Sequence, residues 1–176
     1  MTTSSPVALS PTGAVVLGLL ALLGPSTPYE MEQWVDTSLG HFWSFPRSQL
    51  YSEPARLLEQ GLVDEDREQG GRRRRRCGLT PAGRTALQAW LATPSDDGCE
   101  FRDLGLLRLF FGAAAASPAD VVANEVAQVA AHRRQLEVYQ QLQEVDLEAH
   151  VAATLRLGVA YEEAAVAFWS SVAEGL

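Results

Sequence analysis

The sequence contains no lysine, so all 14 of its basic residues are arginines. Its two cysteines, Cys77 and Cys99, are too few for a disulfide framework and indicate a reducing compartment. The most apolar run, residues 14–24, is much shorter than the roughly 18 residues that a membrane span needs. A secretory signal has a positively charged segment before its apolar run, and here no Lys or Arg precedes the run. We therefore expect a cytoplasmic protein with no membrane partner, in which this run forms a buried helix.

The patterns of enzymes and metal centres are also missing. The histidines His41, His132 and His150 are isolated and share no zinc-type spacing with the cysteines. The sequence has no glycine-rich phosphate loop, no nucleophile elbow and no evident pair of catalytic carboxylates. We expect neither an enzyme nor a metal or other cofactor.

Positive charge is concentrated in one segment of an acidic chain. The formal net charge is −8 and the pI is near 4.8. Residues 41–90 nevertheless carry nine arginines against six acidic residues, whereas residues 1–40 have a net charge of −3 and residues 91–176 of −8. Five of the arginines, Arg72–Arg76, are consecutive. Only the middle segment is suited to attract a polyanion unaided.

The first 93 residues predict three helices, a hairpin and a fourth helix. The first helix begins at Ser10-Pro11 and ends at Gly24-Pro25, and the second runs from Tyr29 to Gly40. The third ends at Gly61, where a helix C-terminal glycine is favoured. The fourth is capped by Thr80-Pro81 and runs to about Thr93.

Helical periodicity gives the third helix two faces. The predicted core face carries Leu50, Pro54, Leu57 and Leu58, and the opposite face carries Ser48, Ser52, Ala55, Arg56 and Glu59, with Gln49 at its edge. Pro54 is expected to kink the helix or to cost it a hydrogen bond.

Gly70-Gly71 is a favoured two-residue hairpin turn between two charged runs. Such a turn pairs Glu68 with Arg73, Arg67 with Arg74, Asp66 with Arg75 and Glu65 with Arg76. If Cys77 and Leu79 face the core, strand alternation directs Arg72, Arg74 and Arg76 away from it, with Arg73 and Arg75 nearer the body.

Residues 94–102 have the composition of a linker, and residues 103–176 are expected to be helical. Ser117-Pro118 begins a long helix, and a last helix begins near Leu147. Both carry apolar residues at three- and four-residue steps, a pattern that is typical of helices that pack against a partner subunit.

These elements predict a mostly α-helical fold with a small β-hairpin: a winged helix-turn-helix domain (residues 1–93) followed by an α-helical dimerisation domain (residues 103–176). In this plan the third helix enters the DNA major groove, and the hairpin, or wing, contacts the flanking backbone. The candidate contacts to double-stranded DNA are Arg47, Ser48, Gln49, Tyr51, Ser52 and Arg56 on the third helix and Arg72, Arg74 and Arg76 on the wing.

Several stretches resemble the PadR family of transcriptional regulators. They are the LLG that ends the first helix, Tyr29-Glu30, FWSFPRSQLYSEPARLLEQGLV, the arginine-rich wing strand, LTPAGRTALQAWL and LRLGVAYEEAAVAFWSSV. The resemblance implies a homodimer clasped by its C-terminal helices, two winged helices on a pseudo-palindromic operator, and repression of a nearby gene. The chain departs from the family at Cys77, where an aromatic residue is usual, at Pro54, and in the scarcity of basic residues on its third helix.

Two interpretations stay open beside these. The aromatic residues Trp90, Phe110, Phe111 and Trp169 are expected to be core residues, as are Trp34, Phe42, Trp43 and Phe45. The resemblance implies a second role for the first four, as the pocket of a small aromatic effector at the dimer interface. The alternative function is a winged-helix protein-interaction module without DNA binding, because the chain is acidic and only Arg47 and Arg56 are basic on the third helix.

Overall fold

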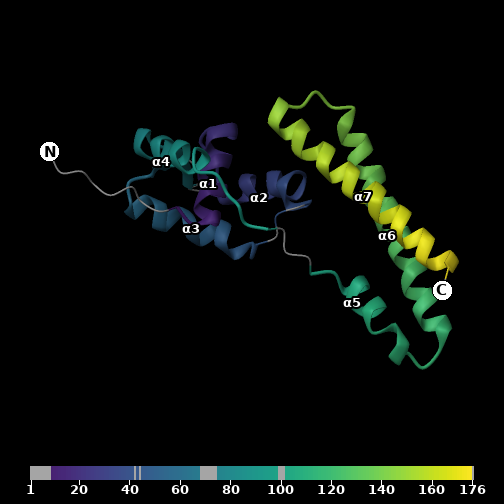
Figure 1. Ribbon diagram of the computed structural model, residues 1–176. Coiled ribbons are helices and arrows are strands. Elements are labelled where there is room, and N and C mark those ends of the chain that lie inside the picture. Colours follow the sequence, from purple (N-terminus) through teal and green to yellow (C-terminus); the bar gives the residue numbers. More distant parts are fainter. Residues whose placement is uncertain (1–8, 42, 44, 68–74, 99–101, 176) are drawn as a thin grey trace. The chain divides into compact units, whose positions relative to one another are not determined.

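The computed structural model describes residues 9–41, 43, 45–67, 75–98 and 102–175 (Figure 1). The chain divides into two compact units, with the boundary between Asp97 and Gly98. Throughout the described ranges, no helix has both the length and the apolar character needed to cross a membrane.

The first unit has the predicted order of three helices, a hairpin and a helix. Its elements are α1 (Pro11–Leu23), α2 (Pro28–Asp36), the 3-10 helix η1 (Leu39–His41), α3 (Ser48–Glu59), β1 (Val63–Arg67), β2 (Arg75–Leu79) and α4 (Pro81–Leu91). Together with the helices of the second unit, this confirms the predicted class, a mostly α-helical fold with an antiparallel hairpin.

Side-chain caps fix where three of these helices begin. The Ser10 hydroxyl accepts a hydrogen bond from the Gly13 backbone N–H (3.0 Å), and Thr80 does the same for Gly83 (3.0 Å). Thr27 and Glu30 form a reciprocal capping box at the start of α2. The Thr80 hydroxyl also donates a hydrogen bond to the Leu62 carbonyl oxygen (3.0 Å). The start of α4 is therefore tied to the start of the hairpin.

The core of the first unit is built around α1. Val16, Leu17, Leu19 and Leu20 are all buried there. The other buried apolar residues of this core are Met31, Val35, Leu50, Leu57, Leu62, Val63, Cys77 and Leu87. Trp34 and Phe45 pack against this core as predicted, whereas Trp43 is 43% exposed and Phe42 lies outside the described residues. Every element from α1 to α4 thus contributes to one apolar centre.

The hairpin register differs by one residue from the predicted register. Val63 pairs with Leu79, Glu65 with Cys77, Asp66 with Arg76 and Arg67 with Arg75. The predicted pairs Glu65–Arg76, Asp66–Arg75 and Arg67–Arg74 are therefore wrong, and Glu68–Arg73 lies outside the described residues. The physical reason is that Val63 and Cys77 are both buried, and the predicted register would have put them on opposite faces of the hairpin.

The other edge of β2 is held by a short bridge. The Ser26 backbone N–H donates to the Cys77 carbonyl (2.9 Å), and the Cys77 N–H donates back to the Ser26 carbonyl (2.9 Å). Burial raises the pKa of the Cys77 thiol, and Glu65 and Asp64 add to the effect. This cysteine therefore acts as a small core residue held from both sides.

Helix α3 continues through Pro54, so the proline does not end it. Leu50, Pro54 and Leu57 are buried as predicted, and the exposed side includes Ser48, Ser52, Ala55 and Glu59. Leu58 is 40% exposed, so its assignment to the core face is wrong. Successive side chains on a helix differ in direction by about 100°, so Leu58 points away from the buried stripe to which Leu57 belongs.

The second unit consists of α5 (Leu104–Phe110), the 3-10 helix η2 (Gly112–Ala114), α6 (Pro118–Gln143) and α7 (Ala149–Gly175). The two long helices, α6 and α7, run side by side as an antiparallel pair (Figure 1). Helix α5 packs on α6, where the Asn124 amide donates to the Gly105 carbonyl (3.4 Å). The Ser117 hydroxyl caps α6, as Ser117-Pro118 predicts.

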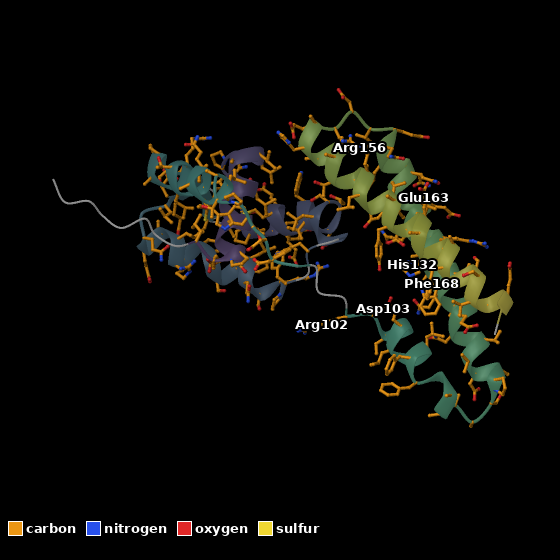
Figure 2. All side chains as sticks on the ribbon, viewed as in Figure 1. Arg102, Asp103, His132, Arg156, Glu163 and Phe168 are labelled. Carbon is orange, nitrogen blue, oxygen red and sulfur yellow. The ribbon has the colours of Figure 1, made fainter. Side chains whose placement is uncertain are left out.

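The interior of the second unit is unusually polar. Trp169 and Tyr139 are buried there together with the carboxylates of Glu125 and Glu162. His132, labelled on α6 in Figure 2, lies with its Nδ1 atom 2.6 Å from Glu162 Oε2 of α7. Glu125 is fully buried, and neither of its oxygens has a hydrogen-bond partner among the described residues.

Large apolar side chains lie on the surface of this unit instead. The most exposed ones are Phe110 (81%), Leu157 (72%), Leu104 (64%) and Phe111 (60%). The prediction that Phe110 and Phe111 are core residues is therefore wrong for the single chain, and Trp90 of α4 is also 44% exposed. Trp169, at 1% exposed, is the one of the four that lies in a core.

We expect Glu125→Leu to increase stability. A buried carboxylate without a hydrogen-bond partner costs several kcal/mol, and a leucine of similar size removes that cost. The free energy of unfolding should rise by about 1–3 kcal/mol in thermal or denaturant unfolding. Glu137→Leu, at an exposed position of the same helix, is the control and should change stability little. A lower stability of the Glu125 variant would contradict this account.

Candidate nucleic-acid interface

The exposed face of α3 carries mainly small side chains and little charge. The hydroxyls of Ser48 and Ser52 are exposed and have no hydrogen-bond partner among the described residues. Tyr51 lies beside them and is 51% exposed, and Ala55 continues the face by one turn. Two hydroxyls and a phenol next to an alanine can accept or donate hydrogen bonds to base edges without steric obstruction.

Arg47, just before α3, is held by two carboxylates of α2. Its Nη2 atom lies 2.7 Å from Asp36 Oδ1, and its Nη1 atom lies 2.9 Å from Asp36 Oδ2 and 3.3 Å from Glu32 Oε1. The Tyr51 hydroxyl donates to the other oxygen of Glu32 (2.6 Å). The hydrogen bond to Asp36 raises the pKa of the Arg47 guanidinium, and that to Glu32 raises the pKa of the Tyr51 phenol.

Gln49 and Arg56 are joined to the start of α1. The Thr12 hydroxyl donates to Gln49 Oε1 (2.6 Å). Arg56 forms an ion pair with Glu53 one turn earlier on α3, and its Nη2 atom also donates to the Ser10 hydroxyl oxygen (3.2 Å). Ser10 in turn donates to Glu53 (3.0 Å). These bonds fix the orientation of α3 on α1 and occupy two of the predicted DNA contacts.

On the wing, the described arginines are Arg75 and Arg76. Arg75 Nε lies 3.4 Å from Glu65 Oε1 of the opposite strand, and Arg75 is well exposed. Arg76 Nη2 lies 3.6 Å from Glu30 Oε2 of α2, while its Nε atom is buried without a partner among the described residues. Arg72 and Arg74 lie outside the described residues. Arg75 therefore lies near Glu65 and not opposite Asp66, its predicted partner. The prediction that Arg75 lies nearer the body than Arg76 is also wrong, because Arg76 reaches Glu30 of α2 and its side chain is the less exposed of the two.

The acidic side chains of α2 were missed by the sequence reasoning. Glu30 reaches the wing, and Glu32 and Asp36 reach α3. A signal for part of this exists in the sequence, because Glu32 and Asp36 are four residues apart and so share a face of their helix. The sequence does not indicate which basic residue that face meets.

The four candidate effector residues belong to two different units. Phe110 and Phe111 form an edge-to-face pair with ring centres 5.1 Å apart. Trp169 pairs in the same way with Phe168, at 5.2 Å, and Trp90 belongs to the other unit. A cavity of about 290 Å³ in the second unit lies between α6 and α7, and its lining is Val126, Val129, Ala130, Arg133, Ser170, Ala173 and Glu174.

No group of three or more histidine, cysteine or acidic side chains that could hold a metal occurs in the described part of the chain. His132 and Glu162 of the second unit are in contact, but they form a group of only two. The first unit combines an exposed helix face on α3 with a strand, β2, that begins with two arginines.

Two family models match the chain. Residues 16–89 match the transcriptional regulator PadR-like family, and residues 101–176 match the virulence activator alpha C-terminal family. No curated protein matches the chain in sequence. The first match spans α1 to α4, and the second spans α5 to α7.

Solved structures match over almost the whole chain. A PadR-like transcriptional regulator from Bacillus cereus is 18% identical, with a TM-score of 0.81 over 93% of this chain and 96% of that one. PadR from Bacillus subtilis in complex with operator DNA is 21% identical, with a TM-score of 0.79 over 92% and 96%. The same protein in complex with p-coumaric acid is 21% identical, with a TM-score of 0.74 over the same shares. At these identities the likeness shows the fold.

The contact between α3 and α1 should give stability an acid-sensitive part. The hydrogen bond from Arg56 lowers the pKa of Glu53 below its ordinary value of 4.5, and that from Ser10 adds to it. As the pH falls, the unfolded chain therefore takes up the proton first. The stabilisation is present above pH 4.5 and is lost as the pH falls through the lower folded-state pKa.

We expect Glu53→Gln to lower the free energy of unfolding at neutral pH by about 0.5–1 kcal/mol. The difference from the wild type should shrink as the pH falls below 4.5. Denaturant unfolding over a series of pH values measures it. Glu59→Gln, exposed at the end of the same helix, is the control. A difference that is independent of pH would contradict the proposed role of the Glu53 carboxylate.

Proposed function

Because residues 16–89 match the transcriptional regulator PadR-like family and residues 101–176 match the virulence activator alpha C-terminal family, we propose that the chain is a PadR-like regulator that binds double-stranded DNA as a homodimer and represses transcription from a pseudo-palindromic operator. The observation that carries this proposal is that one unit combines the exposed, hydroxyl-rich face of α3 with a strand, β2, that continues the arginine run. Similarity to a solved regulator in complex with operator DNA supports it. The protein would act in the cytoplasm.

In the proposed complex, the two parts of the first unit do different work. Ser48, Gln49 and Ser52 read base edges from the major groove. The wing residues Arg72, Arg74 and Arg76 bind phosphates or the minor groove, which adds affinity but little sequence information. Arg47, Tyr51 and Arg56 complete the interface at the edges of α3.

The exposed apolar side chains of the second unit support the homodimer. Phe110 and Phe111 are each at least 60% exposed and pack against each other, with ring centres 5.1 Å apart, and clustered apolar side chains of this kind mark interaction surfaces. Leu104 of α5 and Leu157 of α7 are also more than 60% exposed. We propose that residues 103–176 are the dimerisation domain, that residues 94–102 link it to the DNA-binding domain of residues 1–93, and that a second copy covers these side chains. A two-fold dimer would set the two α3 helices about 34 Å apart, one turn of DNA.

A small aromatic effector is the second part of the proposal. The Bacillus subtilis protein has been solved with p-coumaric acid. We propose that a planar aromatic compound binds between the subunits here, against Phe110, Phe111 and Trp90. Trp169 is enclosed between helices in the single chain, so it would take part only if α6 and α7 move apart. Binding would change the spacing of the two α3 helices and thereby the DNA affinity.

The alternative is a winged-helix module that binds protein and not DNA. A specific observation favours it: the described basic residues of the candidate interface are all within ion-pair distance of carboxylates. The two functions differ in their response to salt, because counterion release from DNA makes the affinity fall steeply with salt concentration.

We expect the affinity for a DNA duplex from upstream of the chain's own gene to fall steeply as salt is raised. In filter binding, Arg72→Ala and Arg74→Ala should each reduce the slope of log K against log salt by about one unit, because each substitution removes one charge that neutralises a phosphate. Arg156→Ala, on α7 of the second unit (Figure 2), removes the same charge from outside the proposed DNA-binding domain and is the control. No binding, or a flat slope for the wild type, would favour the protein-interaction module.

The dimer is tested separately by light scattering. We expect a mass of about twice the 19.1 kDa of one chain. Leu157→Asp should shift the mass towards one chain, because a charge at a covered apolar position is costly to bury. A wild-type mass of one chain would contradict the proposed role of the second unit.

A further inference from the structure

The carboxylates of α2 hold two of the proposed DNA contacts of α3. Glu32 binds both Arg47 and Tyr51, and Asp36 binds Arg47 through both of its oxygens. We infer that Glu32 and Asp36 are specificity-determining positioning residues, which keep Arg47 and Tyr51 off the phosphates and so suppress binding to DNA of arbitrary sequence. The inference rests on the proposed function.

The geometry of Arg47 shows how much of its binding capacity is used. A guanidinium has five N–H groups, and its planar fork suits a carboxylate or a phosphate equally well. In Arg47 the two terminal nitrogens face Asp36, at 2.7 and 2.9 Å, and one of them also faces Glu32. The fork of the two terminal nitrogens is therefore already filled by a carboxylate, which leaves only the Nε side of the guanidinium for a phosphate.

Tyr51 has only one hydrogen to donate. A phenol has one hydrogen, and that of Tyr51 is donated to Glu32 at 2.6 Å. A phosphate oxygen can only accept, so Tyr51 cannot donate to DNA until it leaves Glu32. Its oxygen can still accept a hydrogen bond from a base amino group. The contact to Glu32 thus favours reading a base over binding a phosphate.

Charge acts in the same direction. Glu32, Asp36 and Arg47 carry two negative charges and one positive charge, so this cluster has a net charge of −1 beside the start of α3. The same helix α2 sends Glu30 to Arg76 of the wing, at 3.6 Å. Exposed pairs of this kind are individually weak, so a matching set of base contacts can displace them, whereas arbitrary DNA gains little by doing so.

In this proposal the wing and α3 make different contacts with DNA. Sequence-independent affinity comes almost entirely from phosphate contacts, and specificity comes from base contacts. By neutralising Arg47, α2 leaves phosphate binding to the wing and keeps α3 for the bases. An acidic chain with a strongly basic wing then binds arbitrary DNA weakly.

The test uses the full-length protein and a duplex of random sequence. Asp36→Asn releases Arg47 from its two-oxygen partner and should raise the affinity at least about threefold over wild type. It should also steepen the slope of log K against log salt by about 0.9 for each additional phosphate that is neutralised. Glu32→Gln replaces the carboxylate that accepts from Tyr51 by a weaker neutral acceptor, so it should raise the affinity with a smaller change of slope. Glu163→Gln, exposed on α7 (Figure 2), makes the same change of net charge and is the matched control.

Two further measurements make the outcome decisive. Asp36→Asn combined with Arg47→Ala should lose the gain, because the gain acts through Arg47. Thermal unfolding of each variant establishes that it is folded. The inference is overturned if Asp36→Asn gains no more affinity than Glu163→Gln, or if its salt slope equals that of the wild type. Failure of the wild type itself to bind DNA would instead overturn the proposed function.

Discussion

The packing of α3 against α1 is the contact on which the interface depends. Leu50 and Leu57 are fully buried in the core around α1, and Pro54, which lies between them in the sequence, is also buried. Because a helix is rigid, burying this stripe determines that Ser48, Tyr51 and Ser52 face outward. The polar bonds from Ser10 and Thr12 to Glu53 and Gln49 fix the same orientation at the rim. The exposed face of α3 is therefore a consequence of how the core packs.

Much of this was predictable from local rules. Ser10-Pro11, Thr80-Pro81 and Gly61 mark helix ends because capping depends on a few adjacent residues, and the structure has helix boundaries at all three. The hairpin register was predicted wrongly because the Gly-Gly turn was given priority over burial. Treating Val63 as a core residue beside Cys77 would have excluded that register, since both must share a face.

The candidate site was predictable only in part. Periodicity placed Ser48 and Ser52 on the open face of α3, but nothing local to Arg47 indicates that residues 11 and 15 positions earlier hold it. Ion pairs between separate helices depend on how the helices pack, which one sequence does not reveal. The exposed Phe110 and Phe111 were misplaced for a related reason: apolar residues on an exposed helix face have the same sequence pattern as those of a core.

The central claim is that two α3 helices and two arginine wings of a dimer bind one DNA site. Hydroxyl-radical footprinting on the DNA upstream of the chain's own gene tests it most directly. The account predicts two protected segments about 34 Å, or one helical turn, apart, related by approximate two-fold symmetry. The account would be contradicted by a lack of protection even at saturating protein concentration. A single protected segment without a symmetry-related second one would also contradict it.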